Sequence, residues 1–217
     1  MTPKTAQKTG RTAPSVVVFD MGGVLIDWNP RYLYRKLIAD PEEMERFLAT
    51  VTTTPWHNLQ DAGADPAEAT RLLKAKHPGQ EALIEAFYGR FDEMMEQSFP
   101  EMVALVERLH GARTPLYLLS NAPDLVDVWV RGPAHARHPF FGHFRDYVVS
   151  GVVKCLKPDA AIYDIVCRTG GFQPGEAVLI DDNLPNVEGA RTFGMHAVHH
   201  RSAAETVEAL RKLGLPA

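Results

Sequence analysis

Short apolar runs alternate along the chain with longer segments whose apolar residues recur at helical spacing. The runs are rich in β-branched and aromatic side chains, which is typical of strands buried on both faces of a parallel sheet. Each helical segment ends close to a glycine, a common stop signal. The runs are 16–19, 116–119, 147–149, 177–180 and, more weakly, 196–198, and the helical segments are 100–110, 158–168, 185–193 and 203–213. This alternation predicts an α/β fold, a doubly wound parallel sheet with helices on both faces.

Residues 28–98 interrupt the alternation, because they carry helix signals and no convincing strand. The stretches 40–43 and 65–68 both read Asp-Pro-x-Glu, which places Asp at the N-cap, proline at the first helical position and Glu at the third. Residues 80–95 have the spacing of a further amphipathic helix. We therefore expect residues 15–27 and 99–217 to form the α/β core and residues 28–98 to form an inserted α-helical cap domain.

Composition limits the expected cellular location of the protein and the kinds of partner it can bind. Residues 1–14 hold almost no apolar side chains and are expected to form a disordered tail. No run approaches the roughly 18 apolar residues of a membrane span, and the first 15 residues contain no apolar signal-peptide core. Two cysteines, Cys155 and Cys167, are too few for a disulfide framework. We expect a cytoplasmic protein with no membrane partner. The formal net charge of -4 leaves no broad basic surface, so nucleic acid is not an expected partner either.

Polar side chains stand at the ends of several predicted strands. Asp20 follows the first strand, Ser120-Asn121 follows the second and Asp181-Asp182 follows the fourth. Ligands of open α/β sheets gather beyond the carboxyl ends of the strands, so these residues are expected to share one site. Lys157, just before a predicted helix, would add a fixed positive charge there.

Three carboxylates at one site would repel one another unless a divalent cation lay between them. Mg²⁺, a hard cation that prefers oxygen ligands, is the natural candidate. Gly22 and Gly23 follow Asp20 directly, and two glycines would let backbone N–H groups approach the oxygens of a phosphate closely. The residues thus point to phosphoryl transfer.

Four motifs in this order resemble those of the haloacid dehalogenase-like (HAD) hydrolases. They are Phe19-Asp20-Met21-Gly22-Gly23-Val24-Leu25, Leu119-Ser120-Asn121, Lys157-Pro158 and Ile180-Asp181-Asp182, and the resemblance spans residues 16 to about 200. Four ordered motifs are far more specific than any one of them. The resemblance implies a Rossmann-like core, and it identifies the helical insert as the cap that the family places between its first and second motifs.

The resemblance also implies a magnesium-dependent phosphohydrolase. Asp20 would attack phosphorus in line and form an aspartyl-phosphate intermediate, which is covalent catalysis by a carboxylate. Mg²⁺ would be held by Asp20, by the carbonyl oxygen of Gly22 and by Asp182, with Asp181 helping directly or through water. The substrate is expected to be a small phosphomonoester, and a sugar phosphate is favoured.

Phosphate binding follows from the same resemblance. The Ser120 hydroxyl and the backbone N–H of Asn121 would hold the phosphate, beside the Gly22-Gly23 backbone. Lys157 would pair with Asp20 and with the charge that develops on the phosphoryl group.

Gly22 departs from the family pattern. The family's phosphatases usually have a second Asp two residues after the nucleophile, which protonates the leaving group and later activates water. A positioned acid or base contributes about 10²- to 10⁴-fold, so Gly22 favours leaving groups that need little protonation, such as those of anomeric sugar, acyl or aryl phosphates. Two alternatives stay open, a phosphomutase and, because of Gly22, a catalytically weak sensor of a phosphorylated ligand. Dehalogenation is less favoured, since a metal-binding pair of Asp residues has no use in displacing a halide.

Several other side chains have two interpretations. Asp27 is a candidate substitute acid or part of a hinge. The pair Trp56-His57 either contacts the substrate or fills the core of the cap. His196, His199 and His200 suggest a transition-metal site, but exposed imidazoles at a strand end are the simpler interpretation.

Overall fold

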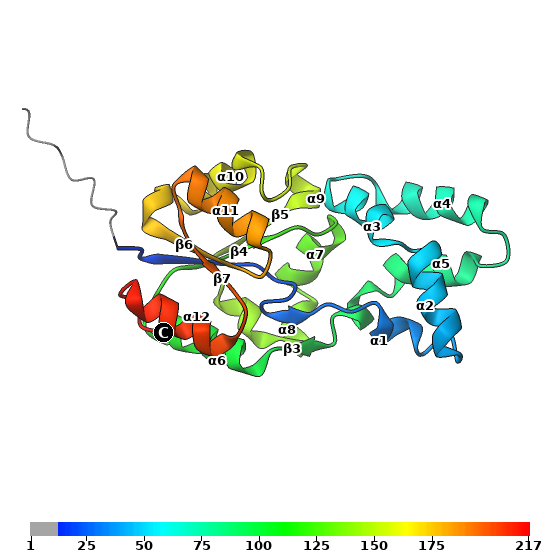
Figure 1. Ribbon diagram of the computed structural model, residues 1–217, viewed down its shortest axis with the longest axis horizontal. Coiled ribbons are helices and arrows are strands. Elements are labelled where there is room, and N and C mark those ends of the chain that lie inside the picture. The colour runs from blue at the N-terminus through cyan, green and yellow to red at the C-terminus, as the bar shows by residue number, and fades with distance from the viewer. Residues whose placement is uncertain (1–12) are drawn as a thin grey trace, which may run out of the picture.

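A five-stranded parallel sheet forms the centre of the computed structural model, which describes residues 13–217 (Figure 1). Its strand order is β5-β4-β1-β6-β7. The strands are β1 (Val16–Phe19), β4 (Leu116–Ser120), β5 (Asp146–Val149), β6 (Ala177–Asp181) and β7 (His196–His199). All five predicted runs are confirmed as strands, and the α/β fold class is confirmed with them. Because β4 and β6 flank β1, the carboxyl ends of these three strands lie side by side.

Alternate residues of β1 face opposite layers of helices. Val17 and Phe19 belong to one buried apolar cluster, which includes α6 (Pro100–Gly111) and α12 (Ala203–Lys212). Val16 and Val18 belong to the other cluster, with α10 (Ala160–Gly170) and α11 (Leu184–Phe193). In Figure 1 these two pairs of helices lie below and above the sheet. Coverage of both faces explains why the strands are unbroken apolar runs rather than alternating ones.

The structure moves the start of one predicted core helix. The helix expected from residue 158 begins at Ala160, because the side chain of Asp159 caps it and accepts a hydrogen bond from Ala161 N at 3.0 Å. It ends at Gly170, and the residue that caps it, Gly171, has a φ of 67°, the left-handed conformation that glycine favours. The remaining short elements of the core are α7 (Leu125–Arg131), α8 (Ala134–Arg137), α9 (Ser150–Val153) and the 3-10 turns Pro139–His143 and Pro174–Glu176.

Residues between two short strands form a helical layer at the carboxyl end of the sheet, at the right of Figure 1. The strands β2 (Ile26–Asp27) and β3 (Gln97–Ser98) pair antiparallel, so the chain leaves and re-enters the core at adjacent points. We call this layer the cap. Its helices are α1 (Arg31–Tyr34), α2 (Pro41–Thr50), α3 (Thr54–Asp61), α4 (Pro66–Lys76), α5 (Glu81–Gly89) and the 3-10 turn Phe91–Met94.

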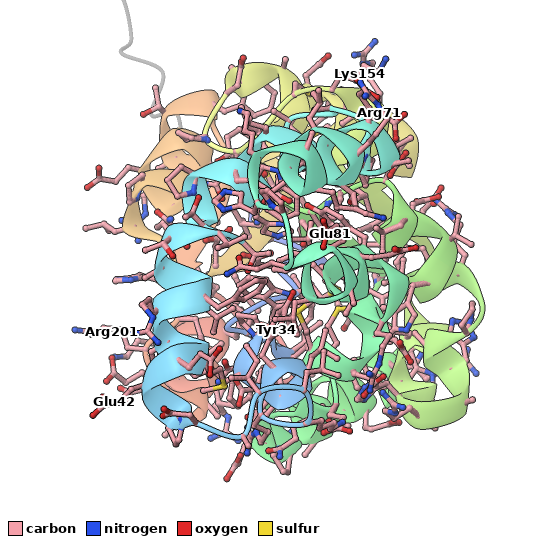
Figure 2. The ribbon with its side chains drawn as sticks, turned by 90° about the vertical axis from the view of Figure 1, so that its right-hand side faces the viewer. Tyr34, Glu42, Arg71, Glu81, Lys154 and Arg201 are labelled. Atoms are coloured by element: carbon pink, nitrogen blue, oxygen red, sulfur yellow. The ribbon has the colours of Figure 1, made fainter. Side chains whose placement is uncertain are left out.

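Both Asp-Pro helix starts in the cap are confirmed. The side chains of Asp40 and Asp65 accept hydrogen bonds from Glu42 N at 2.9 Å and Ala67 N at 2.8 Å. In Figure 2, which faces the cap, Tyr34 lies near the middle of the view, and its buried hydroxyl donates to the carbonyl of Leu83 at 2.9 Å. The buried apolar residues of the cap, Tyr34 among them, are continuous with the apolar cluster of the core.

Two expectations for the cap were wrong in detail. The single helix predicted over residues 80–95 ends at Gly89, a poor helix former, and resumes as a 3-10 turn after Arg90, whose φ is -132°. The segment 28–98 also contains the strand β3, which is two residues long and is recognisable only through its pairing with β2. The expected tail falls largely on residues 1–12, which lie outside the described residues. Within the described part, no helix is long and apolar enough to cross a membrane.

Candidate active site

Lys157 joins the ends of three neighbouring strands. Its ammonium group lies 3.0 Å from Asp20 Oδ1 and 2.6 Å from Asp181 Oδ2, and it donates to the carbonyl of Leu119 at 2.8 Å. Burial by itself would lower the pKa of Lys157, but Asp20 and Asp181 outweigh that effect and raise it. A buried charge is tolerated only with such partners, so Lys157 is a fixed cation of the site.

Asp20 lies at the centre of this arrangement, directly after β1. Its burial raises its pKa, Lys157 opposes the rise, and the nearby carboxylates of Asp181 and Asp182 add to it. The carboxyl group also accepts a hydrogen bond from Met21 N at 2.7 Å. One lysine thus only partly balances three acidic groups, and a further cation would stabilise the ionised form of Asp20.

The three carboxylates fit a cation of this kind. One oxygen from each of Asp20, Asp181 and Asp182 lies within 4.8 Å of the others. The side chain of Asp182 lies against the backbone of Gly23, where an added Cβ would come within 2.3 Å of its Oδ2. Gly23 also has a φ of 71°, a backbone conformation that favours glycine there.

The two adjacent Asp residues have different surroundings. Asp181 is fully buried and accepts from Lys157, from Asn183 N at 2.8 Å and from Asn186 Nδ2 at 3.1 and 3.2 Å. Its oxygens are thus engaged by protein donors. Asp182 is exposed. The geometry therefore favours Asp20 and Asp182 as direct metal ligands, with Asp181 positioning Lys157.

Ser120 and Asn121 lie beside this group at the end of β4. Ser120 is buried. The side chain of Asn121 exchanges two hydrogen bonds with the backbone of Lys157, donating to its carbonyl at 3.0 Å and accepting from its N–H at 2.9 Å. This pair holds the segment of Lys157 against β4. The structure thus brings every predicted site residue to one end of the sheet.

Neighbouring atoms do not force residue 22 to be a glycine. Its φ lies outside the left-handed region, and a Cβ added there would meet only Trp28 Cβ, at 4.0 Å. A Cβ therefore fits at this position without a clash, so the backbone and its neighbours do not by themselves demand glycine. The missing acid is a property of this sequence and not a steric necessity.

The candidates outside the four motifs are placed as follows. The Asp27 carboxylate accepts a short hydrogen bond from the Tyr32 hydroxyl. Trp56 packs on Phe87 with ring centroids 5.2 Å apart, as expected of a residue that fills the cap core. His57 also packs on Phe87, with centroids 5.3 Å apart, and its ring stacks on Trp28, in the segment that follows the first motif, with centroids 5.1 Å and planes 9° apart.

The histidines of β7 do not form a metal site. Among the described residues, the acidic group of Asp20, Asp181 and Asp182 is the one cluster of metal-ligating side chains. His199 Nε2 instead contacts the carbonyl of Asp182 at 2.9 Å, and His200 Nδ1 contacts the Thr206 hydroxyl at 2.8 Å. The three imidazoles lie at or next to the end of a strand, as the simpler interpretation expected, but they are half-buried rather than exposed.

Two further residues support the site and were not predicted from the sequence. Asn186 lies one turn into α11 and binds both oxygens of Asp181. Ser150 begins α9, and its Oγ accepts from Ala122 N at 3.0 Å, which anchors the loop after Ser120. Both are buried polar residues, but Asn and Ser are also common in helix starts, so their positions alone carried no signal.

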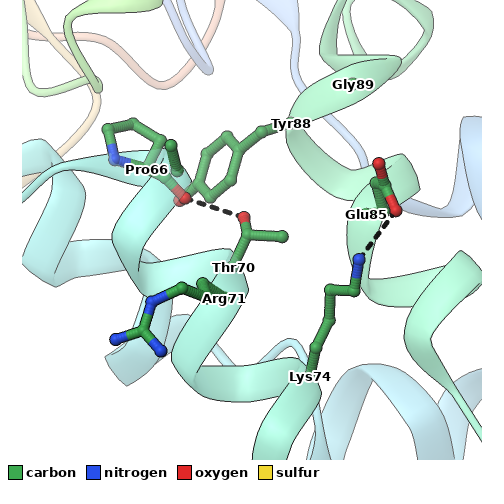
Figure 3. A pocket seen from close by; sticks show the side chains of 8 residues that line it. Pro66, Thr70, Arg71, Lys74, Glu85, Tyr88 and Gly89 are labelled. Atoms are coloured by element: carbon green, nitrogen blue, oxygen red, sulfur yellow. Dashed lines mark hydrogen bonds and ion pairs between the residues drawn. The ribbon is translucent and has the colours of Figure 1, made fainter.

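A groove of about 490 Å³ between α4 and α5 lies apart from these residues (Figure 3). Its polar side chains already form ion pairs and hydrogen bonds with adjacent residues. Lys74 pairs with Glu85 at 2.9 Å, and the Thr70 hydroxyl donates to the carbonyl of Pro66 at 2.7 Å. Arg71 pairs with Glu68 at 2.6 Å. This groove offers no convergent reactive groups.

Comparison with known proteins supports the fold and the motifs. The family model of the haloacid dehalogenase-like hydrolases matches residues 14–194. A sesquiterpene phosphatase of Aspergillus oryzae is 26% identical over 207 residues, 93% of this chain and 97% of that protein. A phosphoserine phosphatase of Thermus thermophilus is 30% identical over 142 residues, 64% of this chain and 50% of that protein.

Solved structures of other proteins share the fold of this chain. A HAD family enzyme from Bacteroides thetaiotaomicron superposes with a TM-score of 0.66 at 23% identity, covering 86% of this chain and 93% of that one. The same enzyme has been solved with magnesium and inorganic phosphate. Since the family match covers most of the chain, including Asp20, Lys157 and Asp181, the chain belongs to the haloacid dehalogenase-like hydrolases, a family of enzymes.

Proposed function

We propose that this enzyme is a Mg²⁺-dependent phosphohydrolase that acts on a small phosphomonoester through an aspartyl-phosphate intermediate. The observation that carries the proposal is the buried contact of Lys157 with both Asp20 and Asp181, beside the exposed Asp182. It combines a nucleophile, a fixed cation and a place for a divalent metal. The relatives named as phosphatases support the same reaction class.

Asp20 is suited to the role of nucleophile. A carboxylate oxygen attacks phosphorus, the bond from phosphorus to the leaving oxygen breaks, and water later attacks the aspartyl phosphate to release inorganic phosphate. Lys157 and the Ser120 hydroxyl hold the phosphoryl oxygens while charge develops on them. Asp20, Asp182 and the carbonyl oxygen of Gly22 would hold a Mg²⁺ ion, which would neutralise negative charge on the phosphoryl group.

Two classes of leaving group are favoured by different observations. Gly22 provides no acid, which favours an anomeric sugar phosphate whose leaving group needs little protonation. The sesquiterpene phosphatase, alike over nearly the whole of both chains, favours a terpenyl phosphate with a largely hydrocarbon leaving group. We take the sugar phosphate as the first candidate.

The test is release of inorganic phosphate from a panel of sugar, terpenyl, aryl and alkyl phosphates in the presence of Mg²⁺. Asp20→Asn keeps the shape of the side chain but removes the nucleophile, so turnover should fall by several orders of magnitude. Residual activity above about one per cent, in a variant that melts like the wild type, would contradict the covalent mechanism. Transfer of phosphate to a second sugar without its release would indicate a phosphomutase instead.

A further inference from the structure

Helix α3 of the cap lies over the two loops that carry the predicted nucleophile and phosphate-binding residues. At its C-terminal end, the carbonyl of Asp61 accepts a hydrogen bond from Ser150 Oγ at 2.6 Å, and the same Oγ accepts from Ala122 N in the loop after β4. One turn earlier, His57 stacks on Trp28, which follows the loop after β1. The leaving group of an in-line attack departs on the side opposite Asp20, away from β1 and toward the cap layer that contains α3 (Figure 1).

The inner face of α3 is polar. His57, Gln60 and Asp61 are all buried, with exposed fractions of 7%, 1% and 9%. Tyr88 of α5 connects two of them: its hydroxyl donates to Gln60 Oε1 at 3.0 Å and lies 2.9 Å from His57 Nδ1. Because that hydroxyl has one proton, which goes to Gln60, it accepts from the Nδ1–H of His57.

His57 therefore presents an unprotonated nitrogen to Asp61. Burial lowers the pKa of His57 to about 4, so the ring is neutral near pH 7, and with its proton on Nδ1 the Nε2 atom is an acceptor. It lies 3.5 Å from Asp61 Oδ1, an oxygen that is buried and has no hydrogen-bond partner among the described residues. When Asp61 is ionised, two acceptors face each other with no donor between them.

A buried donor without a partner belongs to the ring that stacks on the imidazole. Trp28 Nε1 is buried and makes no hydrogen bond among residues 13–217, although the ring of Trp28 is stacked on His57. A buried polar group left unpaired destabilises the folded state, because it has lost its hydrogen bonds to water. Such groups in a native structure often mark a place where a ligand completes the hydrogen bonds.

We propose that Asp61, His57 and Trp28 form a subsite that recognises a hydroxyl group on the leaving group of the substrate. A hydroxyl is both donor and acceptor: it would donate to Asp61 Oδ1 or His57 Nε2 and accept from Trp28 Nε1. The inference rests on the proposed phosphatase function and selects between its two substrate classes. A sugar phosphate completes these hydrogen bonds, whereas a hydrocarbon leaving group leaves them unpaired.

The test compares kcat/KM for a hexose 1-phosphate, farnesyl phosphate and p-nitrophenyl phosphate in the wild type and in Asp61→Leu. Leucine has a similar shape but offers no acceptor. The ratio of kcat/KM for the hexose phosphate to that for each of the other two should fall by about 10-fold or more, as expected for losing a hydrogen bond to a charged group. Asp65→Leu is the matched control, because Asp65 is an exposed N-cap of α4 outside the subsite, and there the ratio should stay constant.

A thermal melt separates recognition from folding. Since Asp61→Leu removes an unpaired buried carboxyl, its melting temperature should equal or exceed that of the wild type. Asp65→Leu should melt at a lower temperature than the wild type, because it removes the N-cap hydrogen bond of α4. An unchanged substrate ratio in Asp61→Leu, or a wild type that prefers farnesyl phosphate, would overturn the subsite while leaving the phosphatase function standing. No turnover of any ester by the wild type would overturn the proposed function and the subsite together.

Discussion

Lys157 and Asp181 form an ion pair of 2.6 Å in which neither side chain has any exposed surface. Asp181 is saturated by donors, and Lys157 has one further carboxylate within reach, that of Asp20. The pair therefore fixes the position of the cation beside the predicted nucleophile. Removal of either partner would leave a buried charge without compensation.

Replacing Lys157 tests this arrangement. Lys157→Met keeps most of the volume and removes the charge, so turnover should fall by roughly 10²-fold or more, as for loss of a group that stabilises developing charge. The variant should also lose about 3–5 kcal/mol of unfolding free energy, because Asp20 and Asp181 stay buried. Steady-state kinetics and denaturant unfolding measure both. Lys212→Met, at an exposed lysine of α12, should change neither, and an unchanged rate in Lys157→Met would place this residue outside the chemistry.

Activation by Mg²⁺ should depend on Asp182 and not on a carboxylate away from the site, such as Asp164. Activity should disappear with EDTA and return with Mg²⁺, and excess Ca²⁺ should inhibit, because its looser coordination disturbs in-line geometry. In Asp182→Asn, the Mg²⁺ concentration for half-maximal activity should rise by roughly 10-fold or more. Asp164→Asn, on the exposed side of α10, is the control. Full activity in EDTA would exclude a metal role for Asp182.

A carboxylate can be restored at position 22. The loop has space for a side chain and a backbone that accepts one, so Gly22→Asp should fold normally. Hydrolysis of alkyl phosphates, whose leaving groups need protonation, should rise by about 10-fold or more, while aryl phosphates should change little. A thermal melt checks the fold. A well-folded variant with no gain on alkyl phosphates would show that another group already serves as the acid.

Asp61 should make the stability of the protein depend on pH. Burial raises its pKa from 3.8 to about 7, so between these values the folded state holds a proton that the unfolded state has lost. The free energy of unfolding of the wild type should therefore fall as pH rises from about 4 to about 7, relative to Asp61→Leu. The nearest titratable groups are His57, neutral above about pH 4, and Tyr88, whose raised pKa keeps it neutral as well.

Thermal melts of both proteins at pH 5 and pH 8 measure this effect. The melting-temperature difference between Asp61→Leu and the wild type should widen by several degrees at the higher pH, since 1 kcal/mol corresponds to roughly 2–4 °C for a chain of this size. A difference that stays constant would mean that Asp61 has a partner in solution which keeps its pKa low.

The sequence by itself determined the strands, the order of the layers and the residues at the strand ends. Strands such as Val16–Phe19 could be predicted because a strand covered on both faces must be apolar throughout, whichever residues pack on it. Asp20, Lys157 and Asp181 were recognisable because chemistry limits the residue types that hold phosphate and metal. Helix starts at Asp40 and Asp65 were equally clear, since an N-cap is a contact within three residues.

Only the tertiary structure decided what each polar residue near the site does. Asn186 binds Asp181 from a different element. Helix α3 contacts segments distant in the chain, because its His57 stacks on Trp28 and its Asp61 accepts from Ser150. Sequence patterns report local conformation and burial, whereas these contacts depend on how the cap is set on the core. For the same reason, the roles of the catalytic and metal residues stay predictions of the motifs, now with a geometry that the variants above can test.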